Sequence, residues 1–287
     1  MNKNQSTDKL LLSLTTSAFA AVFALAQPSF AADSASVSGH GKDDEEHIER
    51  TVLRYKSAVE VNPNKSEIRL KLGQAYLLSG NLPLALEQFQ AATKISPTES
   101  EPYVYISRIY LKQGKDADAL KALLDGRDRN PNDANINYRI GQLYMRIGKI
   151  EDSIKYYREA IKLNKDHGDA HRELGAALGL KGDSEGQLAE LNKALEINSN
   201  DANAYFYQGS AYLALGKMSD AEIALKKCVD LDDKNGDAFR LLAGIQAGGG
   251  HFQEALGYAD KAVAIDPGNK AFLKTQAMIK KKATEQR

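Results

Sequence analysis

Few side chains in this sequence have the types and spacing that catalysis or metal binding requires. His167 and His171 are four residues apart, the spacing that places two metal ligands on one helix face, but Gly168 lies between them where two predicted helices meet. Asp232 and Asp233 lie in a predicted turn, where Asp is common. Motifs of zinc hydrolases, serine hydrolases and phosphate-binding loops do not occur in the sequence. The sequence therefore predicts no catalytic group, no metal site and no cofactor, and we expect a protein that is not an enzyme.

Composition and charge narrow the class of protein further. The 287 residues include 38 basic and 38 acidic side chains, and 43% of the residues are apolar, which favours a soluble, helix-rich protein. Zero net charge argues against nucleic-acid binding. Cys228 is the single cysteine, so one chain can form no disulfide framework. We expect Cys228 to be a small buried apolar residue, and the alternative is a reactive thiol or an intermolecular disulfide.

The first 31 residues have the layout of a secretory signal peptide. Residues 1–9 are polar and carry two lysines, residues 10–26 form a short apolar run, and the small residues Ser29 and Ala31 follow at the spacing of a cleavage site. This layout predicts cleavage after Ala31 and a periplasmic or secreted protein.

Two alternatives to cleavage after Ala31 remain. A second small-x-small sequence ends at Ala26, and an uncleaved segment would act as a membrane anchor. Residues 32–43 contain Gly and Ser and almost no apolar residues, so they predict a flexible linker. The carboxylates that follow, from Asp43 to Glu46, suit the positive end of a helix dipole.

A period of 34 residues organises the rest of the chain. Residues of one kind recur when the sequence is written beneath itself at this offset. One column is mostly glycine: Gly73, Ser107, Gly141, Gly175, Gly209 and Ala243. A second column is mostly aromatic or aliphatic: Phe89, Leu123, Tyr157, Leu191, Leu225 and Ala259. A third column contains Pro63, Pro97, Pro131 and Pro267. Such a period predicts stacked supersecondary units, each of which cannot bury its apolar face alone.

The columns resemble the tetratricopeptide repeat (TPR) family, whose pattern is Leu-Gly-x-x-Tyr, then Ala-x-x-x-Phe, Ala and Pro. Leu72-Gly73-Gln74-Ala75-Tyr76, Ala85, Phe89, Ala92 and Pro97 match this pattern, whereas Arg69 stands where the family often has Trp. The resemblance implies an all-α, right-handed superhelical solenoid of tandem helix-turn-helix repeats.

The register sets the bounds of the predicted units. Six repeats cover residues 66–99, 100–133, 134–167, 168–201, 202–235 and 236–269. Residues 44–65 are a leading half-repeat, because Thr51, Tyr55 and Ala58 fall in the same columns as the second helices of the repeats. Residues 270–287 predict a C-terminal capping helix with an apolar stripe and a lysine-rich face, as a repeat array needs for solubility.

The resemblance also implies where a partner binds, because first helices line the concave groove of TPR proteins. Arginine, lysine and aromatic side chains gather at the groove positions of the central repeats: Tyr105, Arg108, Lys112, Tyr138, Arg139, Gln142, Arg146, Arg172, Phe206 and Tyr207. Tyr and Arg are frequent at binding hot spots, and Arg forms two-pronged contacts with carboxylates. We expect a protein or peptide partner that carries acidic groups.

The predicted function is that of an exported scaffold or adaptor of the bacterial cell envelope, which binds an extended peptide or protein segment in its groove. In one alternative, the groove arginines instead pair with Glu101, Asp169 and Glu173 and only stabilise the fold. In a second, the protein is structural and assembles with copies of itself into homo-oligomers.

Overall fold

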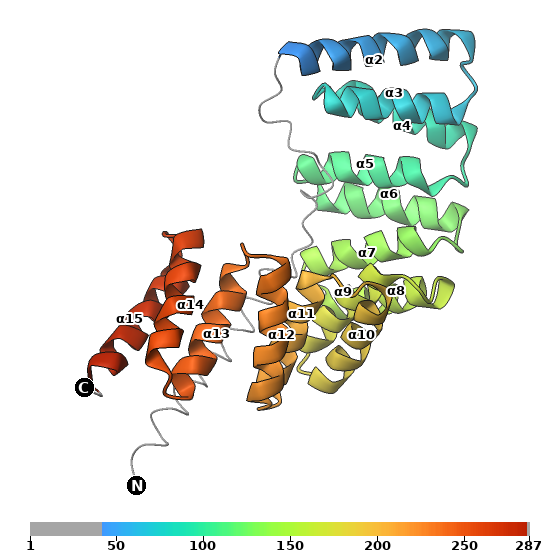
Figure 1. Cartoon of the computed structure of the whole chain (residues 1–287). Helices are drawn as coiled ribbons and strands as arrows, with labels where there is room; N and C mark the ends of the chain where they lie inside the picture. The colour runs from blue at the N-terminus through green and yellow to red at the C-terminus, as the bar shows by residue number, and fades with distance from the viewer. Residues whose placement is uncertain (1–41, 286–287) are drawn as a thin grey trace. The chain divides into compact units, whose positions relative to one another are not determined.

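The computed structural model describes residues 42–285, and its regular structure is helical throughout (Figure 1). The predicted signal peptide and all but the last two residues of the predicted linker lie outside the described residues. The helices are α2 Lys42–Val61, α3 Ser66–Leu78, α4 Leu82–Ile95, α5 Ser100–Lys112, α6 Asp116–Arg129, α7 Ala134–Arg146, α8 Ile150–Leu163, α9 Gly168–Leu180, α10 Ser184–Ile197, α11 Ala202–Ala214, α12 Met218–Leu231, α13 Gly236–Gly248, α14 Phe252–Ile265 and α15 Lys270–Glu285.

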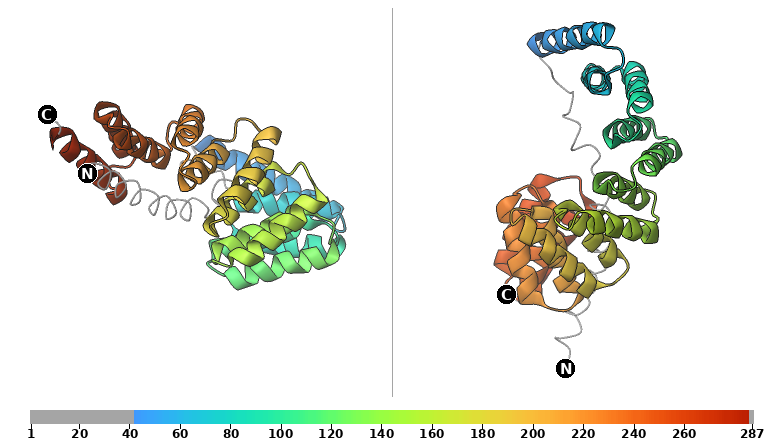
Figure 2. Two further views of the ribbon diagram at one scale, coloured as in Figure 1. Left: turned by 90° about the horizontal axis from the view of Figure 1, so that it is seen from below. Right: turned by 90° about the vertical axis from the view of Figure 1, so that its right-hand side faces the viewer.

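Helices α3 to α14 form consecutive helix-turn-helix pairs, which Figures 1 and 2 show as stacked layers within each part of the chain. The first helix of each pair has 13 residues and the second has 14. The first helices begin at the first residues of the predicted repeats, for example at Ser66 and Ser100. The predicted all-α solenoid of tandem helix-turn-helix repeats is confirmed.

A glycine with positive φ joins the two helices of every pair. These residues are Gly80, Gly114, Gly148, Gly182, Gly216 and Gly250, with φ between 71° and 84°. Only glycine adopts this left-handed conformation without strain, so it ends the first helix and turns the chain back. The two helices of a pair therefore run antiparallel over a short connection.

Close approach within each pair explains the column of small residues on the first helices. A Cβ atom added to Gly73 would lie 2.6 Å from the ring of Phe89, and one added to Gly141 would lie 2.6 Å from the ring of Tyr157. Phe89 and Tyr157 are completely buried. Large side chains of the second helices thus fill the space over backbone that carries no side chain.

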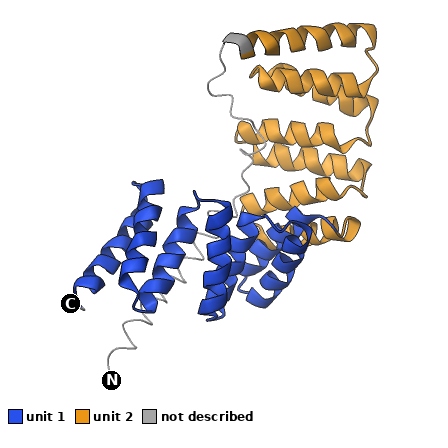
Figure 3. Ribbon diagram, viewed as in Figure 1, with its two compact units in different colours: residues 1–27, 166–287 blue, residues 28–165 orange. Residues whose placement is uncertain are grey.

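The chain divides into two compact units, coloured in Figure 3. Of the described residues, 42–165 belong to unit 2 and 166–285 belong to unit 1. In unit 2 each helix from α3 to α7 packs against the helix before it and the helix after it, and unit 1 repeats this pattern from α10 to α14. Each unit has its own buried clusters, such as the one around Phe206 and Leu225 in unit 1.

Single helices end the repeat array on both sides. Helix α2 begins at Lys42, two residues before the predicted half-repeat, so Lys42 and Asp43 of the predicted linker belong to this helix. It packs against α3. Helix α15 packs against α13 and α14, and its buried residues are Phe272, Thr275 and Ile279.

Candidate functional site

The first helices of unit 2 line an open groove of about 860 Å³. Helices α3, α5 and α7 and the turns before α5 and α7 contribute the lining residues Glu67, Leu70, Glu99, Ser100, Glu101, Val104, Tyr105, Arg108, Asp133, Asn135 and Arg139. Three of the predicted partner-binding residues, Tyr105, Arg108 and Arg139, are in this set.

The guanidinium of Arg108 lies over the ring of Tyr105 in the groove, and other residues hold this ring in place. The guanidinium carbon of Arg108 lies 5.5 Å from the centroid of the Tyr105 ring. Tyr105 stacks on Phe89 with 4.8 Å between centroids and 8° between ring planes, and its hydroxyl accepts a hydrogen bond from Gln74 Nε2 at 2.9 Å. Arg108 has no carboxylate partner among residues 42–285. Its charge is therefore held in place without being neutralised.

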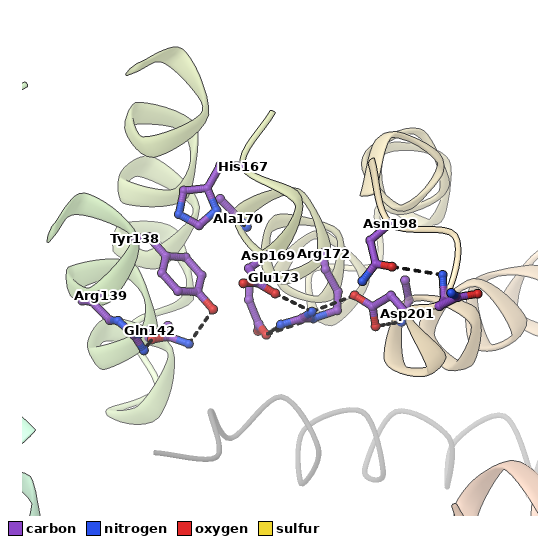
Figure 4. Close-up of polar contacts among 12 residues, drawn as sticks. Tyr138, Arg139, Gln142, His167, Asp169, Ala170, Arg172, Glu173, Asn198 and Asp201 are labelled. Carbon is purple, nitrogen blue, oxygen red and sulfur yellow. Dashed lines mark hydrogen bonds and ion pairs between the residues drawn. The ribbon is translucent and has the colours of Figure 1, made fainter. Parts of the chain in front are cut away.

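A second arginine of the groove is held by its own helix (Figure 4). Arg139 Nη1 donates to Gln142 Oε1 at 3.1 Å, and the guanidinium lies 5.5 Å from the centroid of the Tyr138 ring. Gln142 Nε2 donates to the Tyr138 hydroxyl at 2.7 Å. Tyr138 and Gln142 are 5% and 7% exposed. Both therefore support Arg139 and offer little surface of their own.

Carboxylates form the other edge of the same groove, and of these only Glu101 was named in the sequence analysis. Glu67 and Glu101 lie in the first turns of α3 and α5, and Glu99 and Asp133 are the N-cap residues of α5 and α7. Ser66 Oγ donates to Glu99, and Asp133 Oδ1 accepts from the backbone amide of Ile136.

The same edge contains an unsatisfied buried hydroxyl. Ser100 Oγ is buried and makes no hydrogen bond within the described part of the chain. The groove therefore offers negative, polar and positive groups side by side. The signal for its acidic edge is present in the sequence, because Glu67 and Glu101 occupy one repeat position and Glu99 and Asp133 another.

Two further predicted residues lie outside this lining. Arg146 Nε pairs with Asp116 Oδ1 on α6 at 3.3 Å, so its charge is already matched. Lys112 is exposed at the C-terminal end of α5.

In unit 1, carboxylates surround Arg172 (Figure 4). Its guanidinium lies 2.7 Å from Asp169 Oδ1, 2.7 Å from Asp201 Oδ2 and 3.1 Å from Glu173 Oε1. Burial lowers the pKa of Arg172, but the attraction of Glu173 and Asp201 outweighs burial and raises the pKa above its ordinary value. For Arg172 the alternative of a stabilising ion-pair network is the arrangement that the structure shows.

The last two predicted residues belong to the core of unit 1. Phe206 and Tyr207 are 0% and 3% exposed, and their rings meet edge to face at 5.7 Å. They pack with Ala176, Leu225 and Leu241 in one buried cluster.

The two histidines of the sequence analysis have separate roles. His167 Nδ1 accepts from the backbone amide of Ala170 and caps α9, whereas His171 Nδ1 lies 2.6 Å from Glu190 Oε2. In the described ranges no group of three or more His, Cys, Asp or Glu side chains is arranged to hold a metal ion.

Cys228 is completely buried. Burial, reinforced by Asp232 and Asp201, raises the pKa of its thiol to about 12. At neutral pH this pKa keeps the sulfur in its unreactive thiol form.

None of the helices between residues 42 and 285 combines the length and the apolar character that crossing a membrane requires.

Comparison with known proteins identifies the same repeats. The family model described as tetratricopeptide repeat matches residues 46–100, 138–202 and 206–270, more than half of the chain. No curated protein sequence matches this chain.

Solved structures share the fold at low identity. The Cut9–Hcn1 hetero-tetramer of the APC/C matches with a TM-score of 0.67 and 17% identity, covering 97% of this chain and 57% of that one. PilW, described as a widely conserved type IV pilus biogenesis factor, matches with a TM-score of 0.63 and 20% identity over 73% of this chain and 97% of PilW. YrrB, described as having an unusual peptide-binding site, matches with a TM-score of 0.55 and 22% identity over 67% of this chain and 99% of YrrB. The chain thus spans little more than half of the Cut9–Hcn1 chain that it matches.

Proposed function

The chain belongs to the tetratricopeptide repeat family, and on this premise we propose that it is a non-catalytic adaptor whose groove in unit 2 binds an extended segment of a partner protein. TPR proteins bind peptides or proteins, and the fold is shared with YrrB, which is described as having a peptide-binding site. The groove runs across α3, α5 and α7, so a bound segment would contact three repeats at once.

The observation that carries this proposal is the state of Arg108. Its guanidinium is oriented by Tyr105, lines an open groove and has no carboxylate partner in the described chain. An arginine that is already ordered loses little side-chain entropy when it binds, and it can make two parallel hydrogen bonds to a carboxylate. An acidic side chain or a free carboxylate of the partner is the group that suits it.

The opposite edge of the groove adds a second requirement. Glu67 and Glu101 lie in the first helical turns, and Arg108 lies about 10 Å from Glu101 along the axis of α5 at 1.5 Å per residue. A segment with acidic groups alone would meet repulsion from these carboxylates. We therefore expect a partner segment that presents an acidic group to the arginines and a basic group to the acidic edge.

The place of action that we propose is the bacterial cell envelope, as a periplasmic or secreted protein. This proposal rests on the leader signals of residues 1–31, which lie outside the described residues. Sequencing of the N-terminus of the exported protein is expected to give Ala32 as its first residue. If the sequenced protein still begins with Met1, the leader has not been cleaved and this support is lost.

Capture from an envelope extract tests the groove. The full chain is the bait, and a second bait carries Arg108→Ala. We expect the partner held by the native bait to bind the Arg108→Ala bait roughly thirtyfold more weakly, because truncation of a hot-spot residue costs about 2 kcal/mol.

Lys112→Ala is the matched control, because Lys112 is one helical turn away on α5 but does not line the groove. Its capture should equal that of the native bait. The free energies of unfolding of all three proteins should agree within about 1 kcal/mol. Equal capture by the Arg108→Ala bait would rule out this groove. A large loss of thermal stability in that variant would instead assign Arg108 a structural role.

A further inference from the structure

Helix α2 has the sequence register of the second helix of a repeat. Within the described residues, no first helix of its own repeat packs on it. Thr51 and Tyr55 stand in two columns whose members in the six repeats are at most 3% exposed. In α2 both residues are only partly buried. Helix α2 packs on α3, as each second helix packs on the next repeat, and its other apolar face is left without its usual cover.

Helix α15 has the register of a first helix, and in the part of the chain that the structure describes no second helix of its own repeat packs on it. Ala277 stands in the glycine column of Gly73 and Gly141, whose members are buried under their second helices, yet Ala277 is exposed. On the same face Leu273 is 41% exposed. Helix α15 packs on the preceding helices, α13 and α14.

Neither end helix contains the turn that normally joins the two helices of a repeat. Glu46 and Thr284 stand in the column of the six positive-φ glycines, and both are helical. The first residues of α2 therefore occupy the register of the turn and of the end of a first helix. Among residues 42–285, no first helix in this register packs on α2.

The contacts inside intact repeats show which residues of the two end helices would meet. In repeat 1, Gly73 packs under Phe89, and the same positions are Ala277 in α15 and Tyr55 in α2. In repeat 2, Lys115 lies 6.0 Å from the centroid of the Tyr110 ring, and the same positions are His47 in α2 and Lys280 in α15.

The charges of the two helices are complementary in this register. The first turns of α2 carry the exposed carboxylates Asp44, Glu45, Glu46 and Glu49. The end of α15 carries the lysines Lys280, Lys281 and Lys282. Because the helices of a repeat are antiparallel, the basic end of a first helix lies beside the start of its second helix.

We propose that the protein assembles head to tail, with α15 of one copy and α2 of the next forming one complete repeat between them. The contact joins two different surfaces, so each added copy presents a new free end and growth continues beyond a dimer. The partner that covers both open faces is thus a second copy of this chain. The groove of unit 2 is not part of the contact, so this proposal and the adaptor proposal can fail separately.

Charge reversal at the two ends tests the proposal. Sedimentation of the full chain at rising concentration should show dimers, trimers and longer species, which dissociate at high salt. One variant carries Asp44→Lys with Glu46→Lys, and another carries Lys280→Glu with Lys281→Glu. Each variant alone should need at least tenfold higher concentration to assemble, and an equimolar mixture of the two should assemble like the native chain.

The control variant carries Lys217→Glu with Lys234→Glu, which makes the same change in net charge as the Lys280→Glu with Lys281→Glu variant at exposed positions of unit 1. It should assemble like the native chain. A native chain that stays monomeric at every concentration, growth that stops at a dimer, or a mixture that does not recover would each overturn the proposal. A monomer would mean that another segment or another protein covers α2.

Discussion

The charge of an arginine on a first helix is available to a partner only where neighbouring repeats leave it unpaired. Arg172 pairs with Asp201, the N-cap residue of α11, and its charge is matched. Arg108 has no carboxylate partner within residues 42–285. The contrast explains why we base the binding proposal on Arg108 and not on Arg172.

Glu173 provides a test of the buried ion network at the residue scale. Burial raises the pKa of its carboxyl, although Arg172 acts in the opposite direction, and Oε2 makes no hydrogen bond within the described residues. Between the unfolded and the folded pKa of this carboxyl, the folded state holds a proton that the unfolded state has lost, so stability falls as the pH rises through this range. We expect Glu173→Gln to raise stability by about 1 kcal/mol at neutral pH.

Thermal melts between acidic and neutral pH measure this effect. The difference between Glu173→Gln and the native protein should shrink toward zero as the pH falls below the unfolded pKa of a glutamate. Glu196→Gln, at an exposed position of α10, is the control and should change little at any pH. A Glu173→Gln protein that is less stable at neutral pH would show that the carboxylate is retained for its contact with Arg172.

Contacts between repeats limit how much of the candidate site can be predicted from the sequence. Tyr105, Arg108 and Arg139 were predicted as groove residues, and all three line the groove. The pairing of Arg172 with Asp201 depends on side-chain directions across 29 residues of sequence, and the period does not determine them. Phe206 is buried like other residues of its repeat position, where Leu70, Val104 and Tyr138 are at most 8% exposed.

At the scale of elements, the glycines within helices differ in how closely other side chains pack on them. Gly73 lies under the ring of Phe89, whereas Gly257 in α14 has no atom within 4 Å of the place where a Cβ would be. Gly73→Ala should destabilise the protein by about 1–3 kcal/mol, because the buried ring must move. Gly257→Ala should stabilise it by roughly 0.5–1 kcal/mol, because alanine favours the helix.

Chemical denaturation of the two glycine variants measures these differences. Each variant is the control for the other, since both make the same substitution within a helix. Equal effects of the two substitutions would contradict the close packing of Gly73 on Phe89.

The elements themselves were predictable because each boundary is a local event. A glycine with positive φ ends the first helix, and proline follows the second, for example at Pro97 after α4. Helix α2 begins two residues before the predicted half-repeat. The division into two units between α8 and α9 was not predictable, since the repeat register continues through it without a change.

At the scale of the whole molecule, stability is expected to be lowest where a helix has the fewest covered faces. In a repeat array each helix is stabilised mainly by its immediate neighbours. Within unit 2, α2 packs on one side, whereas α5 packs between α4 and α6 and buries Ile109 completely. Hydrogen exchange of the dilute protein should therefore show that α2 exchanges much faster than α5.

Exchange of α2 at the same rate as α5 would contradict this expectation, and would mean that something outside residues 42–285 covers α2 at low concentration. Helix α6 is a suitable control, because it also packs on both sides.

The backbone of the array has a mechanical consequence. Every backbone hydrogen bond recorded outside the helices joins residues no more than five apart, so in residues 42–285 each such bond stays within one turn or cap. Successive repeats are held together by side-chain packing and by side-chain hydrogen bonds, such as the one from Asn130 Nδ2 to the carbonyl of Thr98, so small shifts between repeats break no hydrogen bond between two backbone groups. A β-sheet has no such freedom, because its strands are cross-linked. Under tension each repeat stack should extend and recoil like a spring, and it should yield one helix pair at a time.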